Sequence, residues 1–325
     1  MSDLRTVDVV FGAGQIGFPL AQALVARGRA VRLVTRSGTD PRLAHVTPLR
    51  ADATDSTAVV EAARGAAVLY HCMNPPYSAR VWAEILPRLQ ANLVEAAGRA
   101  GARLVVLDNL YPLGRTNGHP MSEATPYQPT SHKGDVRARV SLACEEAHRA
   151  GRARVVIGRA SDFYGPRGVA TYFGPMFWRR ALVGKSVPML FSCDVPHAYH
   201  YVEDVAEGLA DLGSAPDDAY GRWWMLPVHA AERTSVLVDR FAMSLGRPIR
   251  LSHVPPALIA ATSLLVPFVR EIREMGYQWE EPFLCDDSKF RARFGRVPVP
   301  RSEAARKTVV WAEGEYGDGS AARAA

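Results

Sequence analysis

The chain has 325 residues, of which 48% are hydrophobic and 22% are charged, and its net charge is +6. This composition is typical of a soluble globular protein with one large or two modest domains, and it excludes low-complexity and disulfide-rich classes. The basic residues are dispersed and form no stripe with interleaved aromatic residues, so we expect a solvated surface with a site for an anion and no nucleic-acid partner.

The chain opens with a predicted strand, glycine turn and helix. Residues 7–11 are apolar and β-branched and lead directly into Gly-x-Gly-x-x-Gly, and residues 18–25 carry apolar side chains at helical spacing. The first glycine permits the tight bend, the second lets the backbone approach a pyrophosphate, and the third lets the helix pack against the strand. The alternative is a glycine-rich turn in some other α/β protein. The predicted cofactor-binding residues of this turn are Gly12, Gly14, Gln15, Ile16 and Gly17.

The second predicted strand, residues 30–35, runs into Arg36 and Ser37. An NAD site usually has an Asp or Glu here, about 20 residues after the glycines, on the ribose hydroxyls. This chain has no carboxylate at that position, and an arginine can pair with a 2′-phosphate through its planar guanidinium. The pattern therefore predicts NADP(H) rather than NAD(H), and the alternative is an exposed arginine in a loop.

Two further strands add residues to the predicted cofactor crevice. The strand at 46–50 is followed by Asp52 and Ala53, where the Asp52 carboxylate is placed to accept a hydrogen bond from the adenine amino group. The strand at 67–72 leads to Asn74. Because ligands of such sheets bind outside the carboxyl ends of the strands, we expect Asn74 to line the crevice.

Two more strands, at residues 103–107 and 153–158, complete the regular part of the pattern. Strands that alternate with helices at short intervals predict an α/β fold with a doubly wound parallel sheet of the Rossmann type. The candidate site residues that follow these two strands are Asn109, Tyr111, Ser161 and Tyr164.

The rhythm of strands and helices changes after residue 165, where aromatic residues and prolines become dense. We expect residues 1–165 to bind the cofactor and residues 166–312 to form mainly a smaller substrate-binding domain, with a segment near 191–213 returning to the first domain. Residues 313–325 are small and polar and are expected to form a flexible tail. An apolar or aromatic small-molecule substrate is favoured by Trp178, Trp223, Trp224 and the apolar run 257–269.

Four features together resemble the extended short-chain dehydrogenase/reductase superfamily, in its NAD-dependent epimerase/dehydratase group. They are the glycine motif, the strand end at Asp52, the run 159–166 and the run 197–206. The resemblance extends to about Trp311, and it implies a nicotinamide cofactor, a small-molecule substrate and a homodimer formed through the long helices. The glycine motif is one residue shorter than the usual extended form, which indicates an atypical branch.

The resemblance also implies an active site made of Ser or Thr, then Tyr, then Lys four residues later. In this chain the three positions hold Asn109, Lys133 and Arg137. In the family the Tyr transfers the proton, the Lys holds the nicotinamide ribose and the Ser orients the substrate oxygen. All three expected residues are therefore replaced.

Two hypotheses follow from the replacement. In the first, the chain is an NADP(H)-dependent oxidoreductase of a carbonyl, imine or enone, in which Asn109 orients the substrate and the proton comes from Lys133, Tyr111 or Tyr164. We expect Lys133, partly desolvated beside Arg137, to release its proton more readily than a free lysine. In the second, carbonyl reduction is lost: the chain is an epimerase, isomerase or lyase, or a non-catalytic NADP(H)-binding protein. Lys133 is also counted among the cofactor-binding residues, because it can instead hold ribose or phosphate.

The remaining sequence features concern the cellular compartment of the protein. The chain enters its first predicted strand without a signal-peptide pattern, and its longest apolar stretch is shorter than the roughly 20 residues that span a bilayer. The four cysteines are scattered, with no Cys-x-x-Cys pair, which favours a reducing environment and argues against a zinc site. We therefore expect a cytoplasmic protein with no membrane partner and no metal.

Overall fold

A computed structural model describes residues 7–169 and 171–317. Its centre is a seven-stranded parallel sheet in the order β11-β6-β5-β4-β1-β2-β3. The order reverses between β1 and β4, which is the switch point at which such sheets bind ligands. The strands are β1 (Val7–Phe11), β2 (Ala30–Thr35), β3 (Val46–Arg50), β4 (Ala66–His71), β5 (Arg103–Asp108), β6 (Arg154–Arg159) and β11 (Trp223–Met225).

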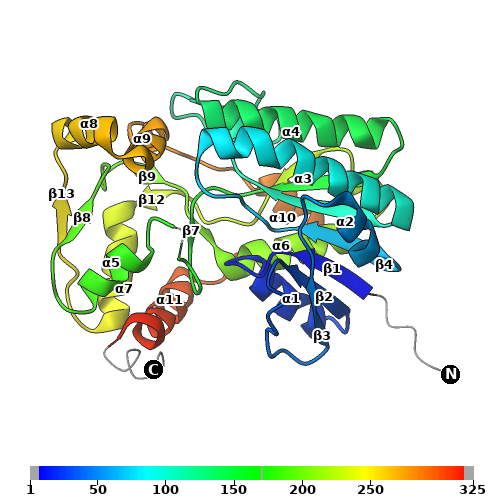
Figure 1. The fold of residues 1–325 in the computed structure, drawn as a ribbon. Coiled ribbons are helices and arrows are strands. Elements are labelled where there is room, and N and C mark those ends of the chain that lie inside the picture. The colour runs from blue at the N-terminus through cyan, green and yellow to red at the C-terminus, as the bar shows by residue number, and fades with distance from the viewer. Residues whose placement is uncertain (1–6, 170, 318–325) are drawn as a thin grey trace.

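Helices cover both faces of this sheet, as Figure 1 shows. Because each strand is buried on both sides, its side chains divide between two cores: Val10 packs with the α1 and α6 side, whereas Val9 and Phe11 pack in the opposite cluster. One layer contains α2 (Ser56–Ala63), α3 (Ala79–Ala100) and α4 (His132–Arg149), and the other contains α1 (Gly17–Ala26) and α6 (Val202–Ser214).

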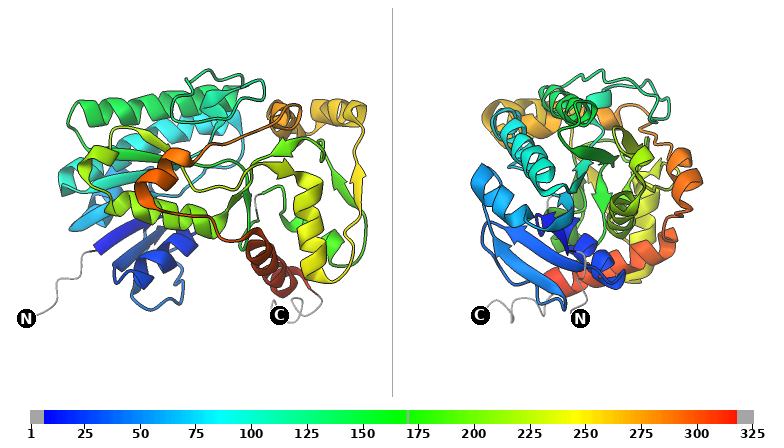
Figure 2. Two further views of the ribbon diagram at one scale, coloured as in Figure 1. Left: turned by 180° about the vertical axis from the view of Figure 1, so that it is seen from behind. Right: turned by 90° about the vertical axis from the view of Figure 1, so that its right-hand side faces the viewer.

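A second body of short elements lies beyond the carboxyl ends of the strands (Figures 1 and 2). In it, β8 pairs in parallel with β13, and α11 packs along α7. The helices are α5 (Pro175–Ala181), α7 (Thr234–Leu245), α8 (Pro256–Leu265), α9 (Pro267–Glu274) and α11 (Arg301–Tyr316), whereas α10 (Ser288–Phe294) packs against β11 of the main sheet. The short strands are β7 (Phe163–Tyr164), β8 (Val187–Met189), β9 (Pro196–His197), β10 (His200–Tyr201), β12 (Glu232–Arg233) and β13 (Leu251–His253). Three 3₁₀ turns complete the elements: η1 (Tyr111–Leu113), η2 (Asp217–Ala219) and η3 (Gly276–Trp279).

The Rossmann-type parallel sheet expected from the sequence is confirmed, with differences in the second half of the chain. Trp223 and Trp224 lie on β11 in the main sheet, so the part of the chain that returns to this sheet extends past residue 213. The tail expected from residue 313 begins later, because α11 continues to Tyr316. The rest of that expected tail, 318–325, lies outside the described residues. Within the described ranges, none of the helices has both the length and the apolar character needed to cross a membrane.

Candidate active site

The glycine turn between β1 and α1 has the geometry that a dinucleotide requires. Gly12 has φ +100°, and a Cβ there would lie 2.9 Å from the carbonyl oxygen of Cys72. A Cβ on Gly17 would lie 1.8 Å from the carbonyl oxygen of Gly12, so only glycine allows α1 to start this close to the strand. By contrast, a Cβ on Gly14 would meet no atom within 4 Å. The turn is therefore closed toward the protein and open on the side from which a pyrophosphate would approach.

The start of α1 supplies donors for that pyrophosphate. Ile16 precedes the helix without a side-chain cap, and the first turn contains no acidic residue, so the free N–H groups and the positive end of the helix dipole face outward. The amide nitrogen of Gln15 is buried and has no hydrogen-bond partner among the described residues. It lies against Gly168, on the loop after β7, where an added Cβ would be 2.9 Å from this nitrogen. An unpaired buried donor beside the glycine turn fits an anionic cofactor.

The residues predicted to bind the adenosine part come together at the ends of β2 and β3. Arg36 and Ser37 are exposed, and the hydroxyl of Ser37 lies 2.8 Å from that of Thr39. The pKa of Asp52 is lowered mainly by hydrogen bonds from Thr54, with a smaller contribution from the positive charge of Arg36. Arg36 and Asp52 are thus close enough to interact electrostatically. Ala53, also predicted here, is buried, and its carbonyl accepts a hydrogen bond from Asn92.

A buried ion cluster lies beneath the carboxyl end of β5. The carboxylate of Asp108 accepts from Arg137 at 2.9 Å, from Arg159 at 3.0 Å and from Ser141 at 2.8 Å. The second nitrogen of the Arg137 guanidinium donates to the side-chain oxygen of Asn74 at 2.8 Å. Arg137 and Asn74, both predicted to belong to the site, are therefore brought together. The guanidinium of Arg137 is also paired with the buried carboxylate of Asp108.

Asn109 and Tyr111 form the wall directly above this cluster. The side-chain oxygen of Asn109 accepts from the backbone N–H of Tyr111 at 3.1 Å, so the amide NH₂ is the part of the side chain that can donate to a substrate oxygen. The hydroxyl of Tyr111 lies 3.2 Å from that of Tyr77. Burial raises the pKa of Tyr111, so this phenol is a neutral hydrogen-bond donor near pH 7.

The structure corrects the expected environment of Lys133. The residue is fully buried, and its ammonium is ion-paired with Glu271 at 2.6 Å and with Glu274. It also donates to the backbone carbonyl of Glu271 at 2.9 Å. The expectation assumed a partly desolvated lysine with only Arg137 beside it, whereas the ammonium is buried between two carboxylates of α9. Lys133 therefore ties the start of α4 to α9.

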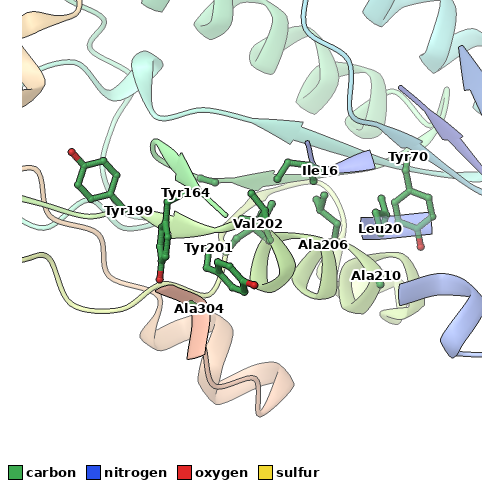
Figure 3. Close-up of a cluster of buried hydrophobic side chains, with 14 of the residues drawn as sticks. Ile16, Leu20, Tyr70, Tyr164, Tyr199, Tyr201, Val202, Ala206, Ala210 and Ala304 are labelled. Carbon is green, nitrogen blue, oxygen red and sulfur yellow. The ribbon is translucent and has the colours of Figure 1, made fainter. Parts of the chain in front are cut away.

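Two other predicted residues are directed away from the crevice. The ring of Tyr164 lies in the core with ring centroids 5.3 Å from Tyr201 and 6.2 Å from Phe241 (Figure 3), and the structure does not place it with Asn109 and Tyr111. Its expected role as an alternative proton donor stays a prediction. The hydroxyl of Ser161 lies 2.8 Å from Nδ1 of His200 and also donates to a backbone carbonyl, so a cofactor contact would need this hydroxyl to accept a further hydrogen bond.

Sequence reasoning missed several residues of the site. Asp162 follows β6 directly, and its place at a strand end was a signal that could have identified it. The guanidinium of Arg167 lies 4.0 Å from the ring centroid of Phe18 at the start of α1. Glu271 and Glu274 come from a segment far along the chain, and nothing in their local sequence connects them with the site.

Comparison with known proteins agrees with this geometry. The sequence profile of the NAD dependent epimerase/dehydratase family matches residues 9–222. A curated relative, the dTDP-glucose 4,6-dehydratase of Neisseria gonorrhoeae, is 26% identical over 191 residues. That match covers 58% of this chain and 53% of the relative, so the chain spans about half the length of the relative it matches.

Solved structures show the same fold over nearly the whole chain. UDP-glucuronic acid 4-epimerase from Bacillus cereus, in complex with NAD, has a TM-score of 0.77 at 16% identity, covering 96% of this chain and 100% of that chain. A nucleoside-diphosphate-sugar epimerase from Pseudomonas aeruginosa has a TM-score of 0.72 at 18% identity, covering 94% and 97%. At these identities the likeness establishes the fold and leaves the reaction to be argued from the site.

Proposed function

This chain belongs to the NAD dependent epimerase/dehydratase family and is an NAD(P)-dependent enzyme; from that premise we propose that it is an NADP(H)-dependent oxidoreductase of a small carbonyl, imine or enone. The observation that carries the proposal is the combination of an open glycine turn with Arg36 where an NAD site would have a carboxylate. When bound, the nicotinamide would supply or accept a hydride at the carboxyl ends of the strands.

The preference for NADP(H) is supported at the end of β2. Arg36 and Ser37 are both exposed, and both can donate to a phosphate on the adenosine ribose. The Asp52 carboxylate, at the end of the neighbouring strand, accepts hydrogen bonds from the backbone N–H and the hydroxyl of Thr54. A 2′-phosphate would therefore meet donors and a positive charge.

An apolar or aromatic substrate is supported by a different set of residues from those first expected. Trp178 is fully buried, and Trp223 and Trp224 belong to the main sheet, so these tryptophans are core residues. Tyr77 and Tyr111, by contrast, are partly exposed beside Asn109. Their rings offer apolar surface, and the Asn109 amide offers a donor for one carbonyl oxygen or imine nitrogen.

Nucleotide binding and turnover test the proposal together. We expect NADPH to bind at least tenfold more tightly than NADH, and NADPH to be consumed with a panel of 4-nitrobenzaldehyde, 2-cyclohexen-1-one and 1-pyrroline. Asn109→Ala should lower turnover far more than it lowers NADPH affinity. Binding without consumption, over this panel and related probes, would favour a non-catalytic nucleotide-binding protein.

A second candidate function rests on the curated relative. Because that relative is a dTDP-glucose 4,6-dehydratase, a sugar-nucleotide epimerase, dehydratase or lyase that uses the cofactor transiently is the alternative. It predicts turnover of dTDP-glucose or UDP-glucose with no net consumption of NADPH. Because Lys133 and Arg137 replace the Tyr and Lys of the family, neither candidate can use the family's usual proton transfer. The assay with sugar nucleotides separates the two candidate functions.

We further propose a homodimer through α3 and α4. A groove of about 780 Å³ runs between these helices and is lined mainly by small and apolar side chains. Gln90 lies in this groove with 3% of its surface exposed, and both polar atoms of its amide lack a partner within the described residues. A second copy of the chain would fill the groove and offer partners for that amide. The four cysteines are unpaired, which supports a reducing compartment such as the cytoplasm.

A further inference from the structure

Asp162 and His197 form a hydrogen-bonded couple at the edge of the cleft. Oδ2 of Asp162 lies 2.9 Å from Nε2 of His197, and the other ring nitrogen, Nδ1, lies 3.2 Å from the carbonyl oxygen of Gln278. The two residues are 35 positions apart in the sequence, and β9 brings them together. Neither residue has a role in the chemistry discussed so far.

The hydrogen bonds of the His197 ring determine how many protons the couple holds. A carbonyl oxygen and a carboxylate oxygen are both acceptors, so each contact requires a proton between the two atoms. A neutral imidazole facing an ionised carboxylate has one proton for these two contacts. The couple therefore holds one additional proton, either on the ring or shared with the Asp162 carboxyl, as assigned from the hydrogen-bond network.

Aromatic rings pack against the imidazole of His197. The imidazole is stacked between Trp279, at a centroid distance of 4.7 Å, and Phe283, at 4.9 Å, and aromatic faces stabilise a cation. The charged groups that act on the same surroundings are Glu274 and Asp287. The other titratable neighbours are uncharged near pH 7, because burial lowers the pKa of His200 to about 3 and raises the pKa values of the others. These others are Tyr77, Tyr111, Tyr172, Tyr199, Tyr277 and Cys285.

The couple is also partly accessible to solvent. His197 is fully buried, whereas 23% of the Asp162 side chain is exposed. The backbone N–H of Ala160 donates to the carbonyl of Asp108 at 3.0 Å, so the ends of β5 and β6 are adjacent, and Asn109 and Asp162 follow these two ends. The charge of Asp162 is the second largest cause of the raised pKa of Tyr111, which places the carboxylate close to that phenol.

We propose that Asp162 is the proton donor that replaces the missing tyrosine, and that His197 positions it and shares its proton. The proposal rests on the proposed oxidoreductase function. In the reducing direction, a hydride from NADPH forms the new C–H bond at the substrate carbon, the C=O or C=N π bond breaks, and the heteroatom takes the couple's additional proton through Asp162. NADP⁺, a neutral imidazole and a carboxylate remain, and solvent returns the proton.

Kinetics of Asp162→Asn test the donor with the probe panel named above. The amide keeps the size and hydrogen bonding of the carboxyl but is a far weaker acid, so kcat should fall about 100-fold or more while the NADPH dissociation constant changes less than twofold. Tyr111→Phe is the competing variant, and a loss of kcat as large as that of Asp162→Asn would assign the proton to Tyr111 and overturn the proposal. Asp239→Asn, an exposed site on α7, is the control for the loss of one carboxylate.

Nitrogen NMR of the protein labelled with ¹⁵N-histidine tests the couple without any substrate. His197→Gln identifies the signals, and its melting temperature shows whether the fold is kept. We expect both ring nitrogens of His197 to be protonated or to share a proton at pH 7, and Asp162→Asn to convert the ring to a neutral form with one bare nitrogen. A neutral ring in the wild type, or full activity of Asp162→Asn, would overturn the proposal. A wild type that binds no NADPH, whatever the NMR shows, would instead overturn the proposed function.

Discussion

Nη1 of Arg159 lies 3.0 Å from Oδ2 of Asp108, and both side chains are almost completely buried. The same carboxylate accepts from Arg137 at 2.9 Å, so one anion compensates two buried cations. The backbone N–H of Asn109 also donates to the Asp108 carboxylate, at 2.8 Å, which holds Asn109 in place. The ion cluster therefore stabilises the carboxyl end of β5 and also fixes the position of Asn109, a residue of the site.

Asp108→Ala should be strongly destabilising, because it leaves Arg137 and Arg159 buried without a counter-charge. Breaking one side of a buried ion pair typically costs about 3–5 kcal/mol. Urea unfolding of the wild type and the variant measures this loss. Asp217→Ala, which removes a largely exposed partner of Arg103, is the control and should cost less than about 1 kcal/mol. Equal effects of the two changes would contradict the prediction.

Lys133→Met should release α9 from the start of α4. The change removes the cation between Glu271 and Glu274 and leaves the two carboxylates facing each other. We expect a loss of about 1–3 kcal/mol and faster hydrogen exchange over residues 267–274. Lys185→Met, at an exposed position, should change neither quantity. Unchanged exchange in α9 would show that Lys133 does not hold this helix.

Arg36→Ala should lower the affinity for NADPH about 10- to 100-fold, because a hydrogen bond to a charged group contributes about 1.5–3 kcal/mol. The affinity for NADH should change little, since NADH has no 2′-phosphate. Isothermal titration with both nucleotides measures the two effects. Arg250→Ala removes another exposed arginine, which directly precedes β13, and should change the affinity for neither nucleotide. Equal weakening of both nucleotides would argue against recognition of the 2′-phosphate.

Ala143→Arg should convert a dimer into a monomer. Ala143 is exposed on α4 and lines the groove between α3 and α4, so an arginine there would place a charge in the proposed interface. Light scattering coupled to size exclusion would show the change in mass. Ala261→Arg, on the exposed side of α8, should leave the mass unchanged. A monomeric wild type would rule out this interface.

Asp204 should make the folded protein less stable as the pH rises from about 4 to 7. Burial raises the pKa of Asp204 from its ordinary value of 3.8 to about 7, so in this window the folded state binds a proton that the unfolded state has released. Stability then falls with rising pH, with a slope of up to about 1.4 kcal/mol per pH unit, and becomes constant above the folded-state pKa.

The comparison of wild type with Asp204→Asn isolates this group from all others. The amide can still accept from the backbone N–H of Val299, which the carboxylate does at 3.0 Å. Urea unfolding at pH 5, 6, 7 and 8 should show the variant gaining stability relative to the wild type as the pH rises. A difference that is independent of pH would contradict the raised pKa.

The sequence by itself determined the parallel sheet and the cofactor turn. Both depend on local patterns: an apolar strand of five residues, three glycines at fixed spacing, and helices of regular period. The close approach of Gly17 to the carbonyl oxygen of Gly12 joins residues five positions apart, so spacing alone reveals it.

Only the tertiary structure decided how the residues beyond this turn are used. Lys133 meets Glu271 and Glu274 across about 140 residues, and His197 meets Asp162 across 35, so no local pattern records these contacts. Trp223 was expected near a substrate and instead pairs with β6 in the main sheet. The charge and exposure of a polar side chain depend on which distant segments pack against it, and that packing is a property of the folded chain as a whole.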